Sequence, residues 1–311
     1  MQRIEAANPW LAGLRHARII EKANADILLG NGLGMLFVEL TSRCNERCIH
    51  CYADSSPERE EMLPETLARQ AIDQAFELGN PYIQFTGGDP LLHPELVELV
   101  GYARAKGGPG IEIYTNGLLL HASLLARLVP LSPRLCFSLY SCEAGVHDAI
   151  TQVPGSHART LAAIRRTQEA GLEVRIGIAL MQQNEATLPA TLDFLQHELG
   201  IGEESIRIDP VHGTGRGSGV EPARNVRIVP RTSPHNPAAE NNGRSGKLAV
   251  AASGDIYPCI FSRRILLGNL NRASLPEMLQ RLSHRKPAAD RATMPDLGCH
   301  DCRIIATLLG A

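Results

Sequence analysis

Residues 41–52 read T-S-R-C-N-E-R-C-I-H-C-Y, and the three cysteines in this stretch are spaced C-x3-C-x2-C. Thiolates this close along the chain can bind three corners of one metal cluster, and sulfur ligands favour iron–sulfur clusters or zinc. The run lacks a fourth ligand, so a cluster of four irons on Cys44, Cys48 and Cys51 would keep one iron open for a reacting molecule. A structural zinc site takes four protein ligands, and a zinc site completed from elsewhere in the chain stays an alternative.

The sequence from residue 34 to 210 alternates apolar, β-prone stretches with helical patterns. The expected strands lie at 35–40, 82–86, 111–115, 135–140, 174–180 and 205–209. The expected helices lie at 65–78, 94–106, 121–129, 157–170 and 186–199. Five strand–helix steps and a sixth strand predict a parallel sheet with right-handed crossovers. Six strands are too few for a closed eight-stranded barrel, so the α/β fold we expect is a partial (β/α)6 TIM-like barrel.

Motif residues follow the expected strands at their carboxyl ends, where parallel α/β folds place active sites. Cys44 follows the first strand, the run Gly87-Gly88-Asp89 follows the second, Asn116 follows the third and Cys142 follows the fourth. We therefore expect these residues to meet at one end of the barrel.

The composition changes after residue 210. H-G-T-G-R-G-S-G (212–219) and the following Arg-, Pro- and Asn-rich run predict a loop or linker, with G-R-G as a flexible turn or a weaker candidate for anion binding. Residues 247–259 predict a β-hairpin turning at 253–255, and a short helix follows over 275–282. The expected divisions are a helical N-terminal extension (1–33), a core domain (34–210), a linker (211–246) and a small C-terminal domain (247–311).

Composition excludes several classes of protein. The 311 residues, 44% of them hydrophobic, suffice for one large domain with a small appendage. A formal charge of −2 and 4% aromatic residues argue against nucleic-acid binding, which needs a basic surface or a base-stacking platform. No apolar run approaches the roughly 20 residues of a membrane span, and the first residues lack a signal-peptide pattern. We expect a cytoplasmic, soluble protein that binds no nucleic acid and no membrane.

With its flanks, the cysteine run resembles the radical S-adenosylmethionine (SAM) superfamily, and the resemblance covers roughly residues 35–210. F-T-G-G-D-P-L-L-H-P (85–94) resembles the Gly-Gly-Glu-Pro segment that receives the amino group of SAM in that family. The resemblance assigns this role to Gly87, Gly88 and Asp89. Asp89 stands where the family more often has Glu, which keeps the charge and shortens the reach by one methylene.

Two further segments carry the resemblance. I-Y-T-N-G (113–117) resembles the third-strand segment of the family, and residues 137–157 resemble its fourth-strand segment. By this analogy Asn116, Ser138 and Arg175 approach SAM, the last two at its ribose or carboxylate, and His50 lies against the adenine. Each motif alone is weak evidence, and their combination carries the assignment.

The late cysteines resemble a second family feature. Gly254-x4-Cys259 followed by Cys299-x2-Cys302 is similar to the auxiliary-cluster domains called SPASM and, in shorter form, twitch. The resemblance implies one auxiliary [4Fe-4S] cluster with three protein thiolates. A zinc site completed by His300 is the alternative.

The resemblance implies an enzyme in which a [4Fe-4S] cluster cleaves SAM, and the resulting radical takes a hydrogen atom from a substrate. It implies an electron donor such as flavodoxin or ferredoxin and, as substrate, a ribosomally made peptide that is cross-linked or epimerised. Two alternatives stay open. One is a dehydrogenase or epimerase of sugars, aminoglycosides or other small molecules, and the other is a zinc-binding scaffold without catalysis.

The two middle cysteines differ in expected role. Cys136 lies within a strand, where a free cysteine is usually a small buried hydrophobe. Cys142 follows the fourth strand, so its thiol is a candidate for returning a hydrogen atom to a substrate radical, as in related epimerases. The alternative is a thiol at the rim without a role. Asp209 and His212 close the sixth strand and are expected to border the pocket.

Overall fold

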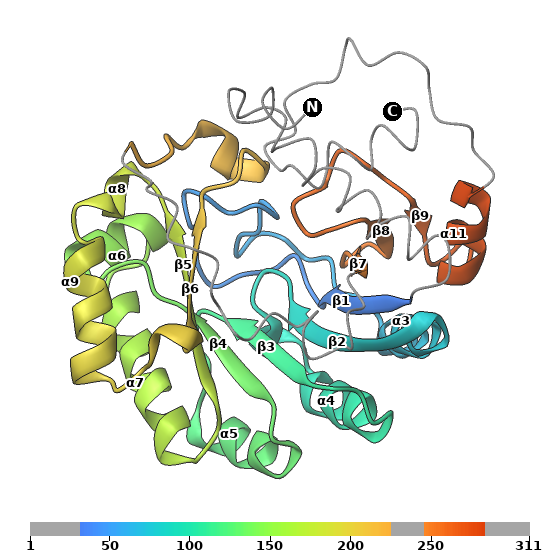
Figure 1. Cartoon of the computed structure of the whole chain (residues 1–311), viewed down its shortest axis with the longest axis horizontal. Coiled ribbons are helices and arrows are strands. Elements are labelled where there is room, and N and C mark those ends of the chain that lie inside the picture. The colour runs from blue at the N-terminus through green and yellow to red at the C-terminus, as the bar shows by residue number, and fades with distance from the viewer. Residues whose placement is uncertain (1–31, 225–245, 284–311) are drawn as a thin grey trace, which may run out of the picture.

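A sheet of nine strands in the order β6-β5-β4-β3-β2-β1-β7-β8-β9 forms the centre of the computed structural model, which describes residues 32–224 and 246–283 (Figure 1). Six of its strands alternate with helices and run parallel to their neighbours. They are β1 (Leu33–Glu39), β2 (Gly79–Thr86), β3 (Ile111–Thr115), β4 (Arg134–Ser138), β5 (Val174–Leu180) and β6 (Ile206–Pro210). The expected open parallel barrel is confirmed.

Helices cover the outer side of this arc of strands, as Figure 1 shows. The helices are α3 (Glu65–Leu78), α4 (Leu96–Ala105), α5 (Ala122–Leu128), α6 (Ala144–Thr151), α7 (Ser156–Glu169), α8 (Gln182–Glu185) and α9 (Leu188–Asp193). Each of the five expected helices is present, although the last one ends at 193 and continues as a π-helical turn over 194–198. The short helices α6 and α8 were not expected, because four to eight residues contain too few turns for a clear period.

The strands separate two environments because successive side chains point to opposite faces. In β2, Ile83 and Phe85 are buried in the hydrophobic core beneath the helices, whereas Tyr82, Gln84 and Thr86 border a cavity on the inner side. The same alternation recurs in β3 and β4. The convex face of the sheet is therefore apolar and packed, and the concave face combines polar side chains with apolar ones such as Met35 and Phe37.

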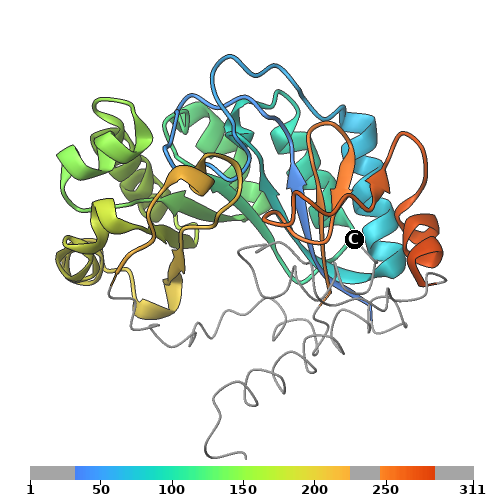
Figure 2. The same ribbon diagram turned by 90° about the horizontal axis from the view of Figure 1, so that it is seen from above.

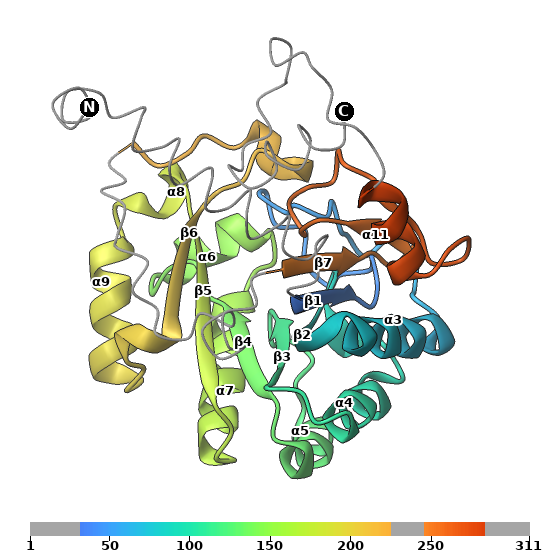
Figure 3. The same ribbon diagram turned by 45° about the vertical axis from the view of Figure 1, so that its right-hand side comes forward.

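The C-terminal hairpin is confirmed, and it continues the main sheet. Strand β7 (Gly246–Val250) pairs in parallel with β1 and antiparallel with β8 (Asp255–Tyr257), which pairs with β9 (Gly268–Asn269), and Figure 3 shows β7 beside β1. Helix α11 (Leu275–Ser283) follows and lies near α3, where the Leu275 amide donates to Gln74 Oε1 at 2.8 Å. The expected domain boundaries stay a prediction, and the hairpin lies at the edge of the core barrel.

Several expectations concern residues that are not described: the helical extension over 1–33, apart from its last two residues, positions 225–245 of the expected linker, positions 284–311 of the expected C-terminal domain, and within the latter the ligands Cys299 and Cys302 and the alternative ligand His300. Among the described helices, none combines the length and the apolar composition that a membrane span requires.

Candidate functional site

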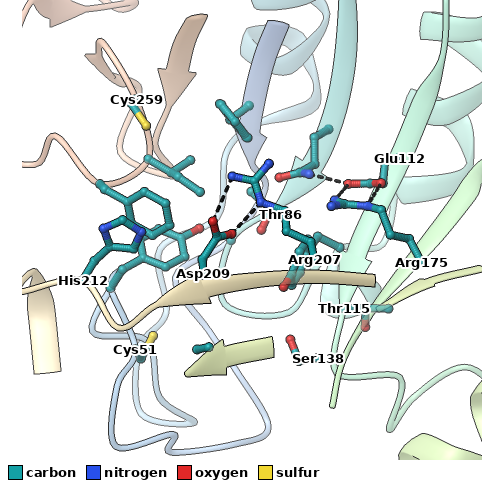
Figure 4. Close-up of a pocket in the computed structure, with 18 of the residues that line it drawn as sticks. Cys51, Thr86, Glu112, Thr115, Ser138, Arg175, Arg207, Asp209, His212 and Cys259 are labelled. Atoms are coloured by element: carbon teal, nitrogen blue, oxygen red, sulfur yellow. Dashed lines mark hydrogen bonds and ion pairs between the residues drawn. The ribbon is translucent and has the colours of Figure 1, made fainter. Parts of the chain in front are cut away.

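A cavity of about 300 Å³ lies on the concave face of the sheet, and most of the expected site residues border it (Figure 4). Four cysteines line it: Cys44, Cys48, Cys51 and Cys259. The residues expected at SAM that also line it are His50, Gly87, Gly88, Asn116, Ser138 and Arg175. Asp209 and His212 border it as expected, whereas Asp89 and Cys142 do not belong to its lining.

The cysteine loop, residues 40–63, leaves β1 and returns toward α3, and Figure 2 shows it arching over one end of the strands. The amides of Cys44 and Cys51 donate to Ser56 O at 3.1 Å and Cys48 O at 3.2 Å, and the amide of Ser55 donates to Cys51 Sγ at 3.4 Å. Burial is the main cause that raises the pKa of the Cys44 and Cys48 thiols. A bound metal ion reverses this effect, because a coordinating thiol is deprotonated.

The three loop cysteines share a cavity without forming a site for a single metal ion among the described residues. Within residues 32–224 and 246–283, no three His, Cys, Asp or Glu side chains lie close enough together to bind one metal ion. The three loop cysteines nevertheless border one cavity. Each thiolate of a cubane binds its own iron, so cluster ligands lie farther apart than the ligands of one zinc ion.

The Gly-Gly pair lets the loop after β2 press against the cysteine loop. A Cβ atom on Gly88 would lie 2.0 Å from Arg43 O, so only glycine fits there. The amide of Gly88 donates to Thr41 O at 2.6 Å, and the amide of Asp89 donates to Arg43 O at 3.0 Å. These contacts fix the backbone at Thr41 and Arg43, directly before the first cysteine.

Asp89 is fully buried, and its carboxylate joins the second and third strand ends. It accepts hydrogen bonds from the amide of Leu91 at 2.9 Å, the hydroxyl of Thr115 at 2.7 Å and the amide of Asn116 at 3.0 Å. Burial raises the pKa of Asp89 to about 6, and these three bonds oppose that shift. Its contact with the amino group of SAM stays a prediction.

Asn116 and His50 lie beside the cysteines. The side-chain amide of Asn116 donates to Asn45 Oδ1 at 2.6 Å and lies 3.8 Å from Cys44 Sγ. The His50 ring packs edge-on against Tyr140, with 4.6 Å between the ring centroids. Its Nδ1 is buried without a hydrogen-bond partner among the described residues. Burial and the nearby Arg216 lower the pKa of His50 to about 4, so the ring is neutral at pH 7.

Arg175 lies in a buried ion pair. Its Nε and Nη2 donate to the two carboxylate oxygens of Glu112, which also accepts from the amide of Gln84 (Figure 4). Arg175 is the second residue of β5, at the amino end of the strand, whereas Ser138 ends β4 on the side of the cysteine loop. Both SAM contacts stay predictions, and the ion pair gives Arg175 a partner that the sequence did not indicate.

Arg216, in the G-R-G segment, holds the cysteine loop from a distant part of the chain. Its Nε donates to Cys48 O at 2.9 Å, its Nη2 donates to Ser55 O at 2.7 Å, and its Nη1 pairs with Asp54 Oδ1 at 2.9 Å. In place of a simple turn, the segment forms a short 3-10 helix over Gly215–Gly219, and its guanidinium contacts three points of the cysteine loop.

The glycines beside Arg216 allow the two segments to touch. Gly215 has a φ of 59°, and a Cβ atom on it would lie 2.4 Å from Cys51 O. A Cβ atom on Gly217 would lie 2.3 Å from His212 O in its own segment and 3.1 Å from His50 O in the cysteine loop. The amide of Arg216 also donates to Cys51 O at 3.0 Å. Glycines on both sides of one arginine were the available signal for this clamp.

Cys259 reaches the cavity because its segment packs on the linker. The Phe261 ring stacks on His212 with 3.6 Å between centroids and meets Tyr52 edge-on at 5.3 Å. The hydroxyl of Thr214 donates to Phe261 O at 3.1 Å. Cys259 therefore lies on the same cavity as the cysteine loop, while its expected co-ligands fall outside the described residues.

Cys142 does not lie where its expected role requires. After Tyr140 the chain turns outward, and the Ser141 hydroxyl donates to Thr187 Oγ1 at 2.9 Å while the Cys142 amide donates to Thr191 Oγ1 at 3.0 Å. These contacts hold the segment against α9 instead of the cavity. Cys136 is fully buried in β4, as expected.

The open parallel barrel presents three cysteines of its first loop to an inner cavity, an arrangement suited to a protein that binds an iron–sulfur cluster. The sequence model of the radical SAM superfamily matches residues 38–195, about half of the chain, and the chain belongs to that superfamily. The model of the SPASM iron–sulfur cluster-binding domain matches residues 242–303, which contain all three late cysteines. These domains imply a [4Fe-4S] cluster, SAM and auxiliary iron–sulfur binding.

Relatives and solved structures agree with this family. The antilisterial bacteriocin subtilosin biosynthesis protein AlbA of Bacillus subtilis is 26% identical over 255 residues, which are 75% of this chain and 56% of AlbA. An AdoMet-dependent heme synthase of Methanosarcina barkeri is 28% identical over 208 residues, 65% of this chain and 58% of the synthase. The chain spans about half the length of the curated relatives it matches.

The fold is also that of Streptococcus suis SuiB bound to S-adenosylmethionine. The TM-score is 0.66 at 16% identity, covering 90% of this chain and 74% of SuiB.

Proposed function

We propose that this chain modifies a peptide by radical SAM chemistry, either by oxidative cross-linking or by epimerisation. The observation that carries the radical chemistry is the single cavity bordered by Cys44, Cys48 and Cys51 together with His50 and Asn116. When bound, the cluster and SAM supply a carbon radical that takes a hydrogen atom from an unactivated C–H bond.

In this proposal the three loop cysteines hold the cluster, and Arg216 and the Gly-Gly segment keep their backbone in place. The partnerless Nδ1 of His50 is available to a ligand in the cavity, and Ser138 offers a hydroxyl at the end of β4. Apolar residues around the cavity, among them Phe37 and Ile178, exclude water from the reacting carbon.

The peptide substrate is supported by AlbA, which matches three quarters of this chain and is named for the biosynthesis of a bacteriocin. The same proposal includes an electron donor such as flavodoxin or ferredoxin, and an auxiliary cluster on Cys259, Cys299 and Cys302. Cys259 supports the auxiliary cluster by bordering the cavity, where a second redox group would lie close to the substrate.

A small-molecule substrate is the second candidate, and the similarity to an AdoMet-dependent heme synthase favours it. Sugars and aminoglycosides belong to the same alternative. Membership in the superfamily disfavours the third alternative, the zinc-binding scaffold, because a scaffold without catalysis would not cleave SAM.

The test is product analysis with the anaerobically reconstituted full chain, SAM, a reductant and a precursor peptide encoded beside the gene. A product lighter by two hydrogens indicates cross-linking, and one deuterium gained in deuterated water at an inverted carbon indicates epimerisation. If the peptide stays unchanged and a carboxylated small molecule or a sugar is modified instead, the small-molecule alternative replaces the peptide substrate.

A further inference from the structure

Positively charged side chains gather at the end of the cavity opposite the cysteine loop. Arg134 is the first residue of β4, and Arg175, Arg207 and Lys247 are the second residues of β5, β6 and β7. All four border the cavity. The cysteine loop follows the carboxyl end of β1, so these four residues, which we call the cationic floor, lie at the amino ends of parallel strands.

The cationic floor carries more positive than negative charge. The carboxylates among the cavity residues that face it are Glu112, the second residue of β3, and Asp209, the fourth residue of β6. Arg134 is paired with Glu173, but Glu173 does not border the cavity and its side chain is 71% exposed. Among the described residues, four cations accompany Glu112 and Asp209 at this end of the cavity, and even with the exposed Glu173 beside Arg134 counted, one positive charge remains in excess.

The ion pairs orient two arginines without using all their donors. Arg207 donates through Nε at 2.5 Å and Nη2 at 3.1 Å to the two oxygens of Asp209, and Arg175 uses the same two nitrogens toward Glu112 (Figure 4). A guanidinium has five N–H donors, so each pair uses two of them. The pairs hold the planar groups in fixed orientations, and a second acceptor then binds with less loss of conformational entropy.

The surroundings favour an anionic ligand over a neutral one. Met35, Phe37, Tyr82 and Tyr114 also border the cavity and lower its local polarity. Charge–charge interactions are stronger in such a setting than in water. A neutral ligand that filled the cavity would remove water from the excess cations without offering an acceptor of opposite charge, which is unfavourable.

We propose that the cationic floor binds a carboxylate of the substrate and thereby turns the reacting carbon toward the cysteine end of the cavity. This inference rests on the proposed function and narrows it to a peptide with an acidic residue near the modified position. A carboxylate on a small molecule has the same chemistry, and the test below separates the two sources.

The test measures binding of fluorescein-labelled decapeptides of alternating Gly and Glu, or Gly and Gln, to the reconstituted full chain by fluorescence anisotropy. We expect the Glu peptide to bind at least about tenfold more tightly than the Gln peptide, in line with one charge-assisted pair. Arg207→Gln and Lys247→Gln should remove most of this preference, and Arg207→Lys should retain part of it. Circular dichroism checks that each variant is folded.

The matched control is Arg127→Gln, which removes an exposed arginine paired with Glu98 on the outer helices and should leave the preference unchanged. Equal binding of the two peptides, or equal loss in Arg127→Gln and Arg207→Gln, overturns the inference. Glutarate serves as the small-molecule probe. If glutarate binds in an Arg207-dependent manner and neither peptide does, the carboxylate site stands and the peptide substrate fails. If no probe binds, the inference is wrong.

Discussion

Arg216 offers the sharpest test of how the fold holds its cysteine loop. Its two hydrogen bonds to the carbonyls of Cys48 and Ser55 join a charged donor to backbone oxygen, and such bonds contribute about 1.5–3 kcal/mol each. Its pair with Asp54, whose side chain is 49% exposed, adds about 0–1 kcal/mol. Because water molecules replace part of the lost hydrogen bonds, we expect Arg216→Gln to destabilise the loop by about 3 kcal/mol.

This loss applies to the state that binds the cluster, so it should weaken iron retention by about a hundredfold. The assay follows the visible absorbance of the reconstituted protein after an iron chelator is added, together with the electron paramagnetic resonance spectrum of the reduced cluster. Arg216→Lys should lie between wild type and Arg216→Gln, because one ammonium group cannot reproduce the three directions of the guanidinium fork.

Arg59 is the matched control, since its Nη2 contacts Asp54 Oδ2 at 2.7 Å and it is half exposed. Arg59→Gln removes another arginine that contacts the Asp54 carboxylate, but it leaves the bonds to Cys48 and Ser55 in place. Its iron retention should equal that of wild type. If Arg216→Gln releases iron no faster than wild type, or if Arg59→Gln releases it equally fast, the clamp is not what holds the loop.

Three further predictions concern packing and charge. Gly88→Ala should lower the free energy of unfolding in urea by about 1–3 kcal/mol, because the added Cβ atom meets Arg43 O. The control Gly145→Ala should not lower it, because the space around that Cβ atom is open. Equal effects of the two substitutions would refute the close approach at Gly88. Glu112→Gln leaves Arg175 buried without its carboxylate partner and should lower the free energy of unfolding by about 3–5 kcal/mol. The control Glu98→Gln, in an exposed ion pair, should lower it by less than about 1 kcal/mol. Similar losses in the two variants would argue against a buried pair at Glu112. Cys142→Ser should change neither SAM cleavage nor the incorporation of solvent deuterium into the product, because the Cys142 segment is bonded to α9. If the variant's product lacks the deuterium that the wild-type product contains, Cys142 is the hydrogen-atom donor after all.

The sequence predicted features that depend on local pattern. Strand and helix positions followed from apolar periodicity, and helix α3 begins and ends at the expected residues. The cysteine run and the Gly-Gly pair were recognisable because their chemistry is contained in a few consecutive residues. The meeting of Cys44 and Asn116 followed from one rule, that parallel strands present their carboxyl ends together.

Features that depend on tertiary contact escaped this reasoning. The bond from Arg216 to Cys48 spans 168 residues, and nothing in G-R-G indicates which carbonyl it meets. Strand β7 joins β1 across more than 200 residues, so a hairpin expected in a separate domain extends the core sheet. Cys142 follows a strand end, yet two hydroxyl contacts turn its segment toward α9, which a strand-end argument cannot foresee.

The decisive measurement is 5′-deoxyadenosine formation from SAM under anaerobic, reducing conditions, with iron and zinc counted in the same preparation. The reconstituted chain should contain about four irons per cubane cluster and form 5′-deoxyadenosine. The Cys44→Ala/Cys48→Ala/Cys51→Ala variant should keep only the auxiliary share of iron and form none, and Cys136→Ser should behave as wild type if it folds. A preparation that binds zinc without iron, or a triple variant that still cleaves SAM, would contradict the assignment of these three cysteines.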